Sequence, residues 1–388
     1  MGAEVSTPLV DFAPVLRLML LASVIALLPL GWLWLRQRGA DGRARMAALT
    51  ALTLFLTFDL IVFGAFTRLS DSGLGCPDWP GCYGQASPLG AAAQIESAQA
   101  AAPGGPVSWS KAWIEMIHRY LAMTVGVLIL VMTIAAWRER LVAQRHGAKT
   151  LPMSPWWPTA TLVWVIVQGL FGKYTVTLKL YTAVVTLHLL GGLTLLALLA
   201  WQHSAFSARP VPIAAPLRRL AVAAMAVLAM QVALGGWVST NYAVLACRSF
   251  PQCDGSWWPA MDFAAGFTLL RGLGVTAEGG ALPYQALVAI HMAHRLFAVV
   301  AAAAIGLLAW LLWRQPSGLP RRAGAVLAAL MIAQMVSGLS NVVLGWPLAA
   351  ALGHSAGAAA LVLVLALVLA RSQPTVESRA LRLAVGAA

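Results

Sequence analysis

Glu115-Met116-Ile117-His118-Arg119 begins a long apolar run, and a second His-Arg pair, His294-Arg295, begins another apolar run 176 residues later. A single histidine follows each pair two apolar segments further on, His188 after the first and His354 after the second. Each half of the chain therefore presents two histidines at similar distances from the starts of their apolar segments.

The composition is that of an integral membrane protein. Of the 388 residues, 60% are hydrophobic and 10% are charged, against roughly 25% charged residues in soluble proteins. Several apolar runs reach the roughly 20 residues that cross a bilayer as a helix. The net charge of +13 comes mostly from short loops between apolar runs, which is a membrane-topology pattern. We predict a protein in contact with the lipid bilayer, with no nucleic-acid partner and no large soluble domain.

We predict an all-α fold of two tandem four-helix transmembrane bundles, related by internal duplication, plus one extra N-terminal transmembrane helix. The nine spanning segments are expected at about 14–35, 46–67, 113–137, 156–175, 180–202, 217–239, 285–313, 322–340 and 349–371. Residues 1–14 lack the basic start of a secretory signal, so the first segment is predicted to be an uncleaved helix. The expected divisions are 1–45, 46–205 and 206–388, the last including a cytoplasmic tail.

Basic residues set the predicted orientation. One side of the segments carries Arg36, Arg38, Arg43, Arg45, Arg138, Arg140, Arg145, Lys149, Arg209, Arg218, Arg219, Arg314, Arg321, Arg322, Arg371, Arg379 and Arg382. The other side carries Arg68, Lys111, Lys173, Lys179, Arg248 and Arg271. The first side is predicted to be cytoplasmic. The C-terminus then lies inside and the N-terminus outside.

Near-constant offsets between the two halves predict the duplication. Gly64, Cys76 and Cys82 recur 171 residues later as Gly235, Cys247 and Cys253. Gln168, Gly172, His188 and Gly191 recur 166 residues later as Gln334, Gly338, His354 and Gly357. Such offsets at three groups of landmarks are hard to obtain by chance.

The four paired histidines are predicted to be heme ligands. They lie five to ten residues into helices that run inward from the outer face, or roughly 8–15 Å below it at 1.5 Å per residue. Polar residues at this depth are costly and tend to face the bundle interior. Two histidines on two helices of one bundle can bind heme iron from both sides.

Other roles for membrane histidines are weaker interpretations. Interhelical hydrogen bonds use single histidines, whereas four paired at matched depth favour ligation. A zinc site needs a further His, Cys or Asp nearby, and none is evident at that depth. His146 and His203 fall in predicted cytoplasmic loops, where we expect them to be solvated.

The halves differ three residues before each His-Arg pair, with Glu115 in the first half and His291 in the second. This spacing places each side chain on the same helix face as its histidine. A carboxylate beside a buried heme can handle protons or stabilise charge, while an ion pair with Lys111 or Arg119 is the alternative. The asymmetry predicts that one site does the chemistry and the other serves it.

Arg68, Arg119 and Arg295 lie near the outer ends of predicted helices, beside the expected hemes. Arginine pairs well with carboxylates, and heme propionates would be such partners. Snorkelling of the guanidinium groups to the membrane interface explains the same positions equally well.

All four cysteines lie in predicted outer loops, in Gly75-Cys-Pro-Asp-Trp-Pro-Gly-Cys82 and Cys247-Arg-Ser-Phe-Pro-Gln-Cys253. The outer side of a bacterial inner membrane is oxidising, so disulfides persist there. The equal spacing predicts two local disulfides, Cys76–Cys82 and Cys247–Cys253, each closing a loop near a heme. They serve either as structural staples or as redox-active pairs, and the sequence does not separate these roles.

A set of motifs resembles those of bacterial, cysteine-containing heme A synthases. The set comprises Gly64–Cys82, Glu115-x-x-His118-Arg119, His294-Arg295, His188 and His354, within residues 46–371. The resemblance implies oxidation of the C8 methyl group of heme O to a formyl group, by successive hydroxylations, to give heme A for terminal oxidases. Glu115 matches the family's acidic residue, which is expected to assist catalysis. The role of the family's cysteines is less settled.

The resemblance also implies that the N-terminal bundle holds substrate heme O and the C-terminal bundle holds heme b as cofactor. The implied residues are His118, His188, Arg68 and Arg119 for the substrate heme, and His294, His354 and Arg295 for the cofactor heme. Heme O synthase is the expected delivery partner. The resemblance does not identify the electron acceptor. It also does not give the oligomeric state, for which a homo-oligomer is one alternative.

The expected location is the bacterial inner membrane, with the cysteine loops on the periplasmic side and the C-terminus in the cytoplasm. One feature departs from the family pattern of eight helices with both ends cytoplasmic. Segment 14–35 makes nine helices here and places the N-terminus outside.

A di-heme b-type electron carrier, linked to quinol, is the main alternative function. It uses the same bis-histidine bundles but does not need a carboxylate in one half only. A transporter with parallel repeats explains the duplication, but not four matched histidines, and its sites usually lie near the membrane midplane.

Overall fold

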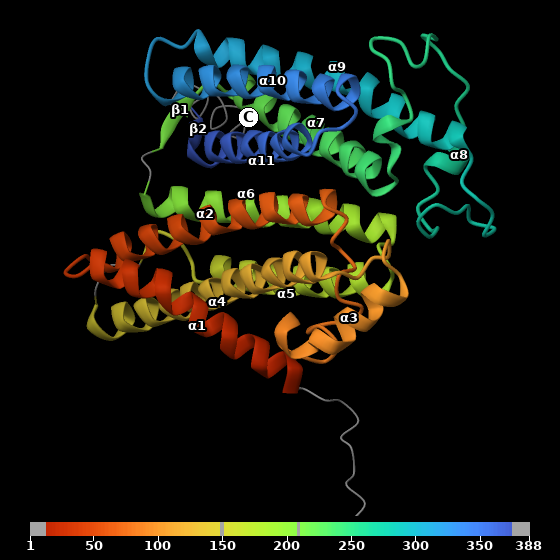
Figure 1. Cartoon of the computed structure of the whole chain (residues 1–388). Helices are drawn as coiled ribbons and strands as arrows, with labels where there is room; N and C mark the ends of the chain where they lie inside the picture. Colours follow the sequence, from red (N-terminus) through yellow and green to blue (C-terminus); the bar gives the residue numbers. More distant parts are fainter. Residues whose placement is uncertain (1–12, 148–150, 208–209, 375–388) are drawn as a thin grey trace, which may run out of the picture.

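The computed structural model describes residues 13–147, 151–207 and 210–374 (Figure 1). Its long helices are α1 (Ala13–Arg36), α2 (Gly42–Leu69), α4 (Trp109–His146), α5 (Trp156–Thr177), α6 (Thr182–Ser207), α7 (Ala215–Thr240), α9 (Tyr284–Trp313), α10 (Leu319–Val343) and α11 (Leu348–Arg371). The short elements are η1 (Pro88–Ala91), α3 (Ala92–Ala101), β1 (Val211–Ile213), η2 (Ala243–Leu245), α8 (Phe263–Gly266) and β2 (Ser372–Pro374).

Within these described ranges, eight helices are long and apolar enough to cross a membrane: α1, α2, α4, α6, α7, α9, α10 and α11. The predicted all-α integral membrane fold is therefore confirmed. The ninth predicted span, α5, is a 22-residue helix, but it falls outside this group because it includes Gln168, Lys173 and four threonines. It nevertheless packs against α4 and α6 as part of their bundle.

Side-chain caps start two of the helices that frame the first histidine. The Asp41 carboxylate accepts a 2.7 Å hydrogen bond from the Ala44 N–H at the start of α2. The Ser108 hydroxyl accepts one of 3.4 Å from the Lys111 N–H at the start of α4. Each cap satisfies an N–H group that has no partner within the first helical turn.

Helix α4 is longer than the sequence predicted. It runs to His146 and ends where Gly147 adopts a left-handed φ of 60°, as glycine commonly does after a helix. The predicted basic loop is therefore wrong over residues 138–146, because its arginines extend the helix with polar turns beyond the apolar segment. Lys149 lies outside the described residues, as do Arg209, Arg379 and Arg382.

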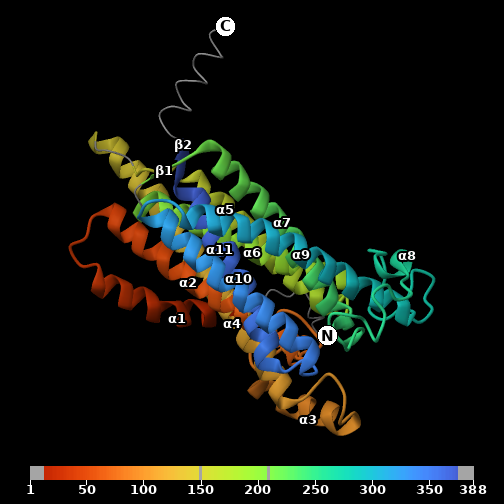
Figure 2. The same ribbon diagram turned by 90° about the horizontal axis from the view of Figure 1, so that it is seen from above.

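Apart from α1, the long helices pack as two groups of four, which lie side by side in Figure 1 and overlap in the view of Figure 2. In the first group, α2 contacts α4 and α6, and α5 contacts α4 and α6. In the second, α9 contacts α7 and α10, and α11 contacts α7 and α10. This packing matches the two predicted bundles. Their origin by duplication, and the divisions at 45 and 205, stay predictions.

The two bundles share one apolar core. Helix α6 contacts both α7 and α11, and α2 also contacts α11. Fully buried leucines from both groups, including Leu196, Leu308 and Leu365, belong to one cluster. The positions of the two histidine pairs are therefore fixed relative to each other.

Both cysteine loops lie at the same end of the helices, because α2 ends just before Cys76 and α7 ends just before Cys247. Figure 1 shows α3 and α8 at this end, and β1 and β2 at the opposite end. There, Val211–Ile213 pairs in parallel with Ser372–Pro374. This short strand pair links the segment before α7, the first helix of the second bundle, to the end of α11, its last helix.

The extra helix α1 packs mainly on α4. Its Leu18 side chain is fully buried in a cluster with Cys76, Cys82 and Met116. The helix that precedes the family motifs therefore supports the first cysteine loop.

His203 does not lie in a solvated loop, as the sequence had suggested. It lies on α6, half-buried, with Nδ1 3.2 Å from the Ala47 carbonyl oxygen and Nε2 2.9 Å from the Ser207 hydroxyl. The interpretation was wrong because α6 continues past its apolar segment and packs against the start of α2. His146, the last residue of α4, is exposed as expected.

Candidate functional site

The first histidine pair comprises His118 on α4 and His188 on α6, which lie close enough to interact electrostatically. Each ring packs against a glycine of a neighbouring helix. An ideal Cβ on Gly64 of α2 would lie 2.9 Å from His118 Cε1, and one on Gly172 of α5 would lie 3.5 Å from His188 Cε1. The glycine at position 64 is therefore required for the close approach of the His118 ring.

The second pair, His294 on α9 and His354 on α11, repeats this arrangement and also lies within electrostatic range. An ideal Cβ on Gly235 of α7 would lie 3.0 Å from His294 Cε1. One on Gly338 of α10 would lie 3.2 Å from His354 Cε1. All four imidazoles are half-buried.

The four histidines lie at similar depths on helices that begin at the cysteine-loop end. His188 and His354 follow the first residues of α6 and α11 by six residues, while His118 and His294 follow those of α4 and α9 by nine and ten residues. At 1.5 Å per residue, these positions are roughly 9 and 15 Å from the helix starts. The sequence-based estimate of depth agrees with this geometry.

Each pair has the donor set of an iron-porphyrin site. Two imidazoles from two helices supply two axial ligands, and a porphyrin supplies the four equatorial donors. In the described part of the chain, no three His, Cys, Asp or Glu side chains are grouped so that they could hold a metal ion. The glycines beside the rings provide room for the imidazoles close to the neighbouring helix backbones.

Glu115 lies against the first cysteine loop with only 3% of its surface exposed. Its Oε2 accepts a 2.8 Å hydrogen bond from the Cys76 N–H, and its Oε1 forms an ion pair with Arg119. Gly75 permits this docking, since a side chain there would collide with the α4 backbone at Lys111 and Ala112. The carboxylate is thus one helical turn from His118 and is held by the loop.

Arg119 closes the same loop from the other side. Its guanidinium donates to the carbonyl oxygens of Asp78 at 2.9 Å and Pro80 at 3.1 Å, and also to that of Gly81. The alternative in which Glu115 pairs with Arg119 is therefore seen in the structure. Lys111 instead pairs with Asp71, at 3.5 Å.

The second cysteine loop is held in the same way, with His291 in the place of Glu115. His291 Nδ1 lies 3.3 Å from the Cys247 N–H, and its Nε2 accepts a 3.1 Å hydrogen bond from Arg295 Nε. Arg295 also donates to the carbonyl oxygens of Cys247 at 2.8 Å and Ser249 at 2.9 Å. His291 is therefore part of the loop attachment, and the two halves differ in charge at one equivalent place.

Both predicted disulfides, Cys76–Cys82 and Cys247–Cys253, are present. Each closes the loop that the neighbouring arginine and its partner attach to α4 or α9. A disulfide and a buried polar side chain together fix each loop above its histidine pair.

Replacement of Arg119 by glutamine is expected to destabilise the protein by about 3–5 kcal/mol, because it leaves the buried Glu115 carboxylate without its cation. Arg295→Gln is the matched control and should cost less, since its partner is an imidazole nitrogen of His291. Thermal unfolding of both variants in detergent checks this. Equal losses of stability would contradict the account.

Arg68 joins the two bundles at the cysteine-loop end. It donates a 2.5 Å hydrogen bond to the Ser239 carbonyl oxygen, and its guanidinium lies 4.1 Å from the centre of the Tyr242 ring. The Tyr242 hydroxyl in turn donates a 2.8 Å hydrogen bond to Asp71. Nothing in the sequence pattern indicated this link, because its partners are 171 residues apart.

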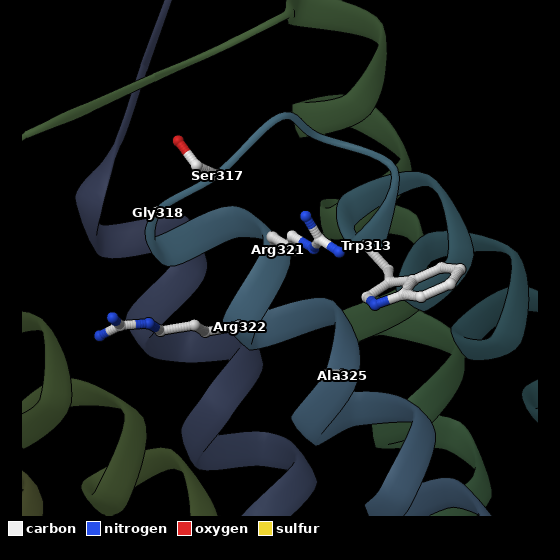
Figure 3. A pocket seen from close by; sticks show the side chains of 6 residues that line it. All are labelled: Trp313, Ser317, Gly318, Arg321, Arg322 and Ala325. Atoms are coloured by element: carbon white, nitrogen blue, oxygen red, sulfur yellow. The ribbon is translucent and has the colours of Figure 1, made fainter.

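An open hollow at the turn between α9 and α10 lies away from these sites. Its lining residues are Trp313, Ser317, Gly318, Arg321, Arg322 and Ala325 (Figure 3). Trp313 is nineteen residues beyond His294 on α9, or roughly 28 Å along the helix axis. The hollow therefore does not belong to either histidine pair.

Comparison with known proteins agrees with this arrangement. Residues 47–366 match the model of the COX15-CtaA family, described as cytochrome oxidase assembly protein. This chain belongs to that family.

Relatives in the COX15-CtaA family carry the name heme A synthase. The protein of Shewanella oneidensis is 39% identical over 323 residues, which cover 82% of this chain and 93% of the relative. That of Rhizorhabdus wittichii is 28% identical over 339 residues, covering 81% and 90%. The family match begins after α1 and includes both cysteine loops and all four paired histidines.

Gly64→Val is expected to lower heme loading of the first pair in this COX15-CtaA family member, because the added Cβ would displace the His118 ring. Gly126→Val on α4 is a matched control, since a Cβ there meets nothing within 4 Å. Heme content per purified protein measures the effect. Equal loading of the two variants would show that Gly64 does not position His118.

Proposed function

We propose that this chain is a heme A synthase, an oxidoreductase that converts heme O to heme A for cytochrome oxidase assembly. The proposal rests on family membership and on relatives named heme A synthase. The observation in the structure that supports it is the pairing of four histidines, with the Glu115 carboxylate near the first pair and the His291 imidazole at the equivalent place in the second half. The product would carry a formyl group where heme O has its C8 methyl.

The two histidine pairs would hold different hemes, one the substrate and the other the cofactor. His118 and His188 would hold substrate heme O in the bundle of α2, α4, α5 and α6. His294 and His354 would hold heme b in the bundle of α7, α9, α10 and α11. When bound, heme b would supply one-electron redox chemistry.

Glu115 would handle protons at the substrate site. It lies on α4 one turn from His118, and a carboxylate so placed can accept or return a proton at its free lone pairs. Its ion pair with Arg119 holds the carboxyl group in one orientation. The matching residue His291 would serve only the loop attachment in the second half.

Arg68, Arg119 and Arg295 would contribute to the heme sites mainly through the loops. Their guanidinium groups are bound to backbone carbonyl groups of the outer loops and helix ends. These contacts place positive charge above each histidine pair, where it would favour the carboxylates of a bound heme.

The proposed location is the bacterial inner membrane, with the cysteine loops in the periplasm and the C-terminus in the cytoplasm. The excess of lysine and arginine at the end opposite the cysteine loops supports this orientation. Heme O synthase would deliver the substrate, and an unidentified acceptor would take the electrons released.

Complementation tests the proposed function. A bacterium that makes heme O and an a-type oxidase, but has lost its own heme A synthase, would be given this chain. The proposal expects the a-type absorption band and oxidase activity to return. A membrane-inserted chain that restores neither would contradict it, provided that the host's own enzyme restores both.

A further inference from the structure

The two histidine pairs differ in the partners of their Nδ1 atoms. In the described chain, the buried Nδ1 atoms of His118 and His188 have no hydrogen-bond partner. His294 Nδ1 lies 3.1 Å from the side-chain amide of Gln231, and His354 Nδ1 lies 3.0 Å from the Ser337 hydroxyl. Only the second pair therefore has polar side chains that fix the imidazoles.

The glycines beside the rings identify the matching positions in the first pair. Gln231 lies four residues before Gly235 on α7. The residue four before Gly64 on α2 is Leu60. Leucine can neither donate nor accept a hydrogen bond, so the absence of a partner for His118 follows from the residue type.

The same comparison holds for the other histidine of each pair. Ser337 directly precedes Gly338 on α10, and Phe171 directly precedes Gly172 on α5. Again the second half has a polar side chain where the first half has an apolar one.

The chemistry of these contacts suits iron ligation through Nε2. A neutral histidine that binds iron through Nε2 carries its proton on Nδ1, which then needs an acceptor. The Ser337 hydroxyl donates to the Ala333 carbonyl oxygen at 2.8 Å, which leaves its lone pair free to accept from His354. Gln231 Nε2 also donates a 3.3 Å hydrogen bond to the His294 carbonyl oxygen. A half-turn of the Gln231 amide would exchange that bond for one in which Oε1, which has no partner, accepts from His294 Nδ1.

We propose that Gln231 and Ser337 are positioning residues that make the second pair a retaining heme site. Leu60 and Phe171 make the first pair an exchanging site, from which a heme can leave. The inference rests on the proposed function, because it requires heme at both pairs. A substrate site must release its product, whereas a cofactor site benefits from slow release of its heme. The difference in side chains therefore fits a substrate site at the first pair and a cofactor site at the second.

Heme release from the full-length protein tests the proposal. Purified protein loaded with heme b would be mixed with excess apomyoglobin, and heme transfer followed by absorbance. Gln231→Leu and Ser337→Ala are each expected to speed release from the second pair by about 10-fold or more, the usual effect of removing such a partner. Ser340→Ala is the matched control, because its hydroxyl bonds only to its own helix at Val336, and it should release heme like the wild type.

A redox titration of the same samples separates positioning from general loosening. A hydrogen bond from Nδ1–H makes the imidazole a stronger donor to ferric iron, so its loss should raise the midpoint potential of the bound heme. Unchanged release and unchanged potential in both variants would overturn the proposal.

The reciprocal change is expected to improve retention, a result that misfolding cannot produce. In a His294→Ala chain loaded with heme b at the first pair, Leu60→Gln combined with Phe171→Ser should slow release. Release that is unchanged or faster would overturn the proposal. A wild-type protein that takes up no heme at all would overturn both the proposed function and this inference.

Discussion

Glu115→Gln is expected to abolish heme A formation, by a factor of about 100 or more, while both hemes stay bound. Glutamine keeps an oxygen that can accept the Cys76 N–H hydrogen bond, so the first loop should remain attached. It cannot take up or return a proton at physiological pH, and loss of a general acid–base group typically costs about 10²–10⁴ in rate. Heme A per heme b, measured in membranes with equal amounts of protein, checks this.

Two controls separate catalysis by Glu115 from its attachment of the loop. Glu115→Gln and Glu115→Ala both remove the counter-ion of the buried Arg119. Glu115→Ala should lose activity and more stability than Glu115→Gln, because it also removes the acceptor of the Cys76 N–H hydrogen bond. His291→Gln changes the equivalent place in the second half and should keep most activity. Full activity in Glu115→Gln would mean that the carboxylate only holds the loop, as His291 does.

His294→Ala and His354→Ala are each expected to remove heme b and, with it, heme A formation. At the proposed heme b site, each would remove one of the two imidazoles, and the absorption spectrum of a bis-histidine heme should disappear. His118→Ala and His188→Ala should instead keep heme b and lose heme O binding. Reduced-minus-oxidised spectra and extracted heme identify which heme each variant holds.

The opposite pattern has a clear meaning. If His294→Ala and His354→Ala kept their heme b, while His118→Ala lost it, the cofactor would belong to the first bundle. The assignment of Gln231 and Ser337 to a retaining site would then be wrong as well.

The fold and the histidine pairs could be predicted because they depend on local patterns. Apolar segments of spanning length indicated helices, and matched spacing brought His118 with His188 and His294 with His354. The two disulfides followed from equal spacing in equivalent loops. Such features need only chain order and helix geometry.

The attachments of the loops could not be predicted in full, because they depend on contacts between distant segments. The sequence allowed Glu115 to pair with Arg119, but it did not show that both bind the Cys76–Cys82 loop. The sequence placed His291 on the same helix face as His294, but it did not indicate the contact with Cys247. In the first loop, close packing of Gly75 on the α4 backbone permits the attachment, and only the folded chain shows it.

Composition also gave the wrong C-terminal ends for two helices, α4 and α6, because both extend beyond their apolar segments. The polar last turns of α4 resemble a basic loop in sequence, although helix-forming residues continue to Gly147. The last turns of α6 likewise carry His203 into contact with α2. In both cases hydropathy marks the apolar part of a helix and not its end.

Direct chemical analysis of heme tests the central claim best. A host that makes heme O, but no heme A, would be grown with and without this chain, and its extracted hemes separated by liquid chromatography and identified by mass. The account predicts heme A, or its hydroxylated precursor, only in cells that carry the chain, and neither with Glu115→Gln. Unchanged heme O, in cells where the protein is inserted and holds heme b, would contradict it and favour an electron carrier.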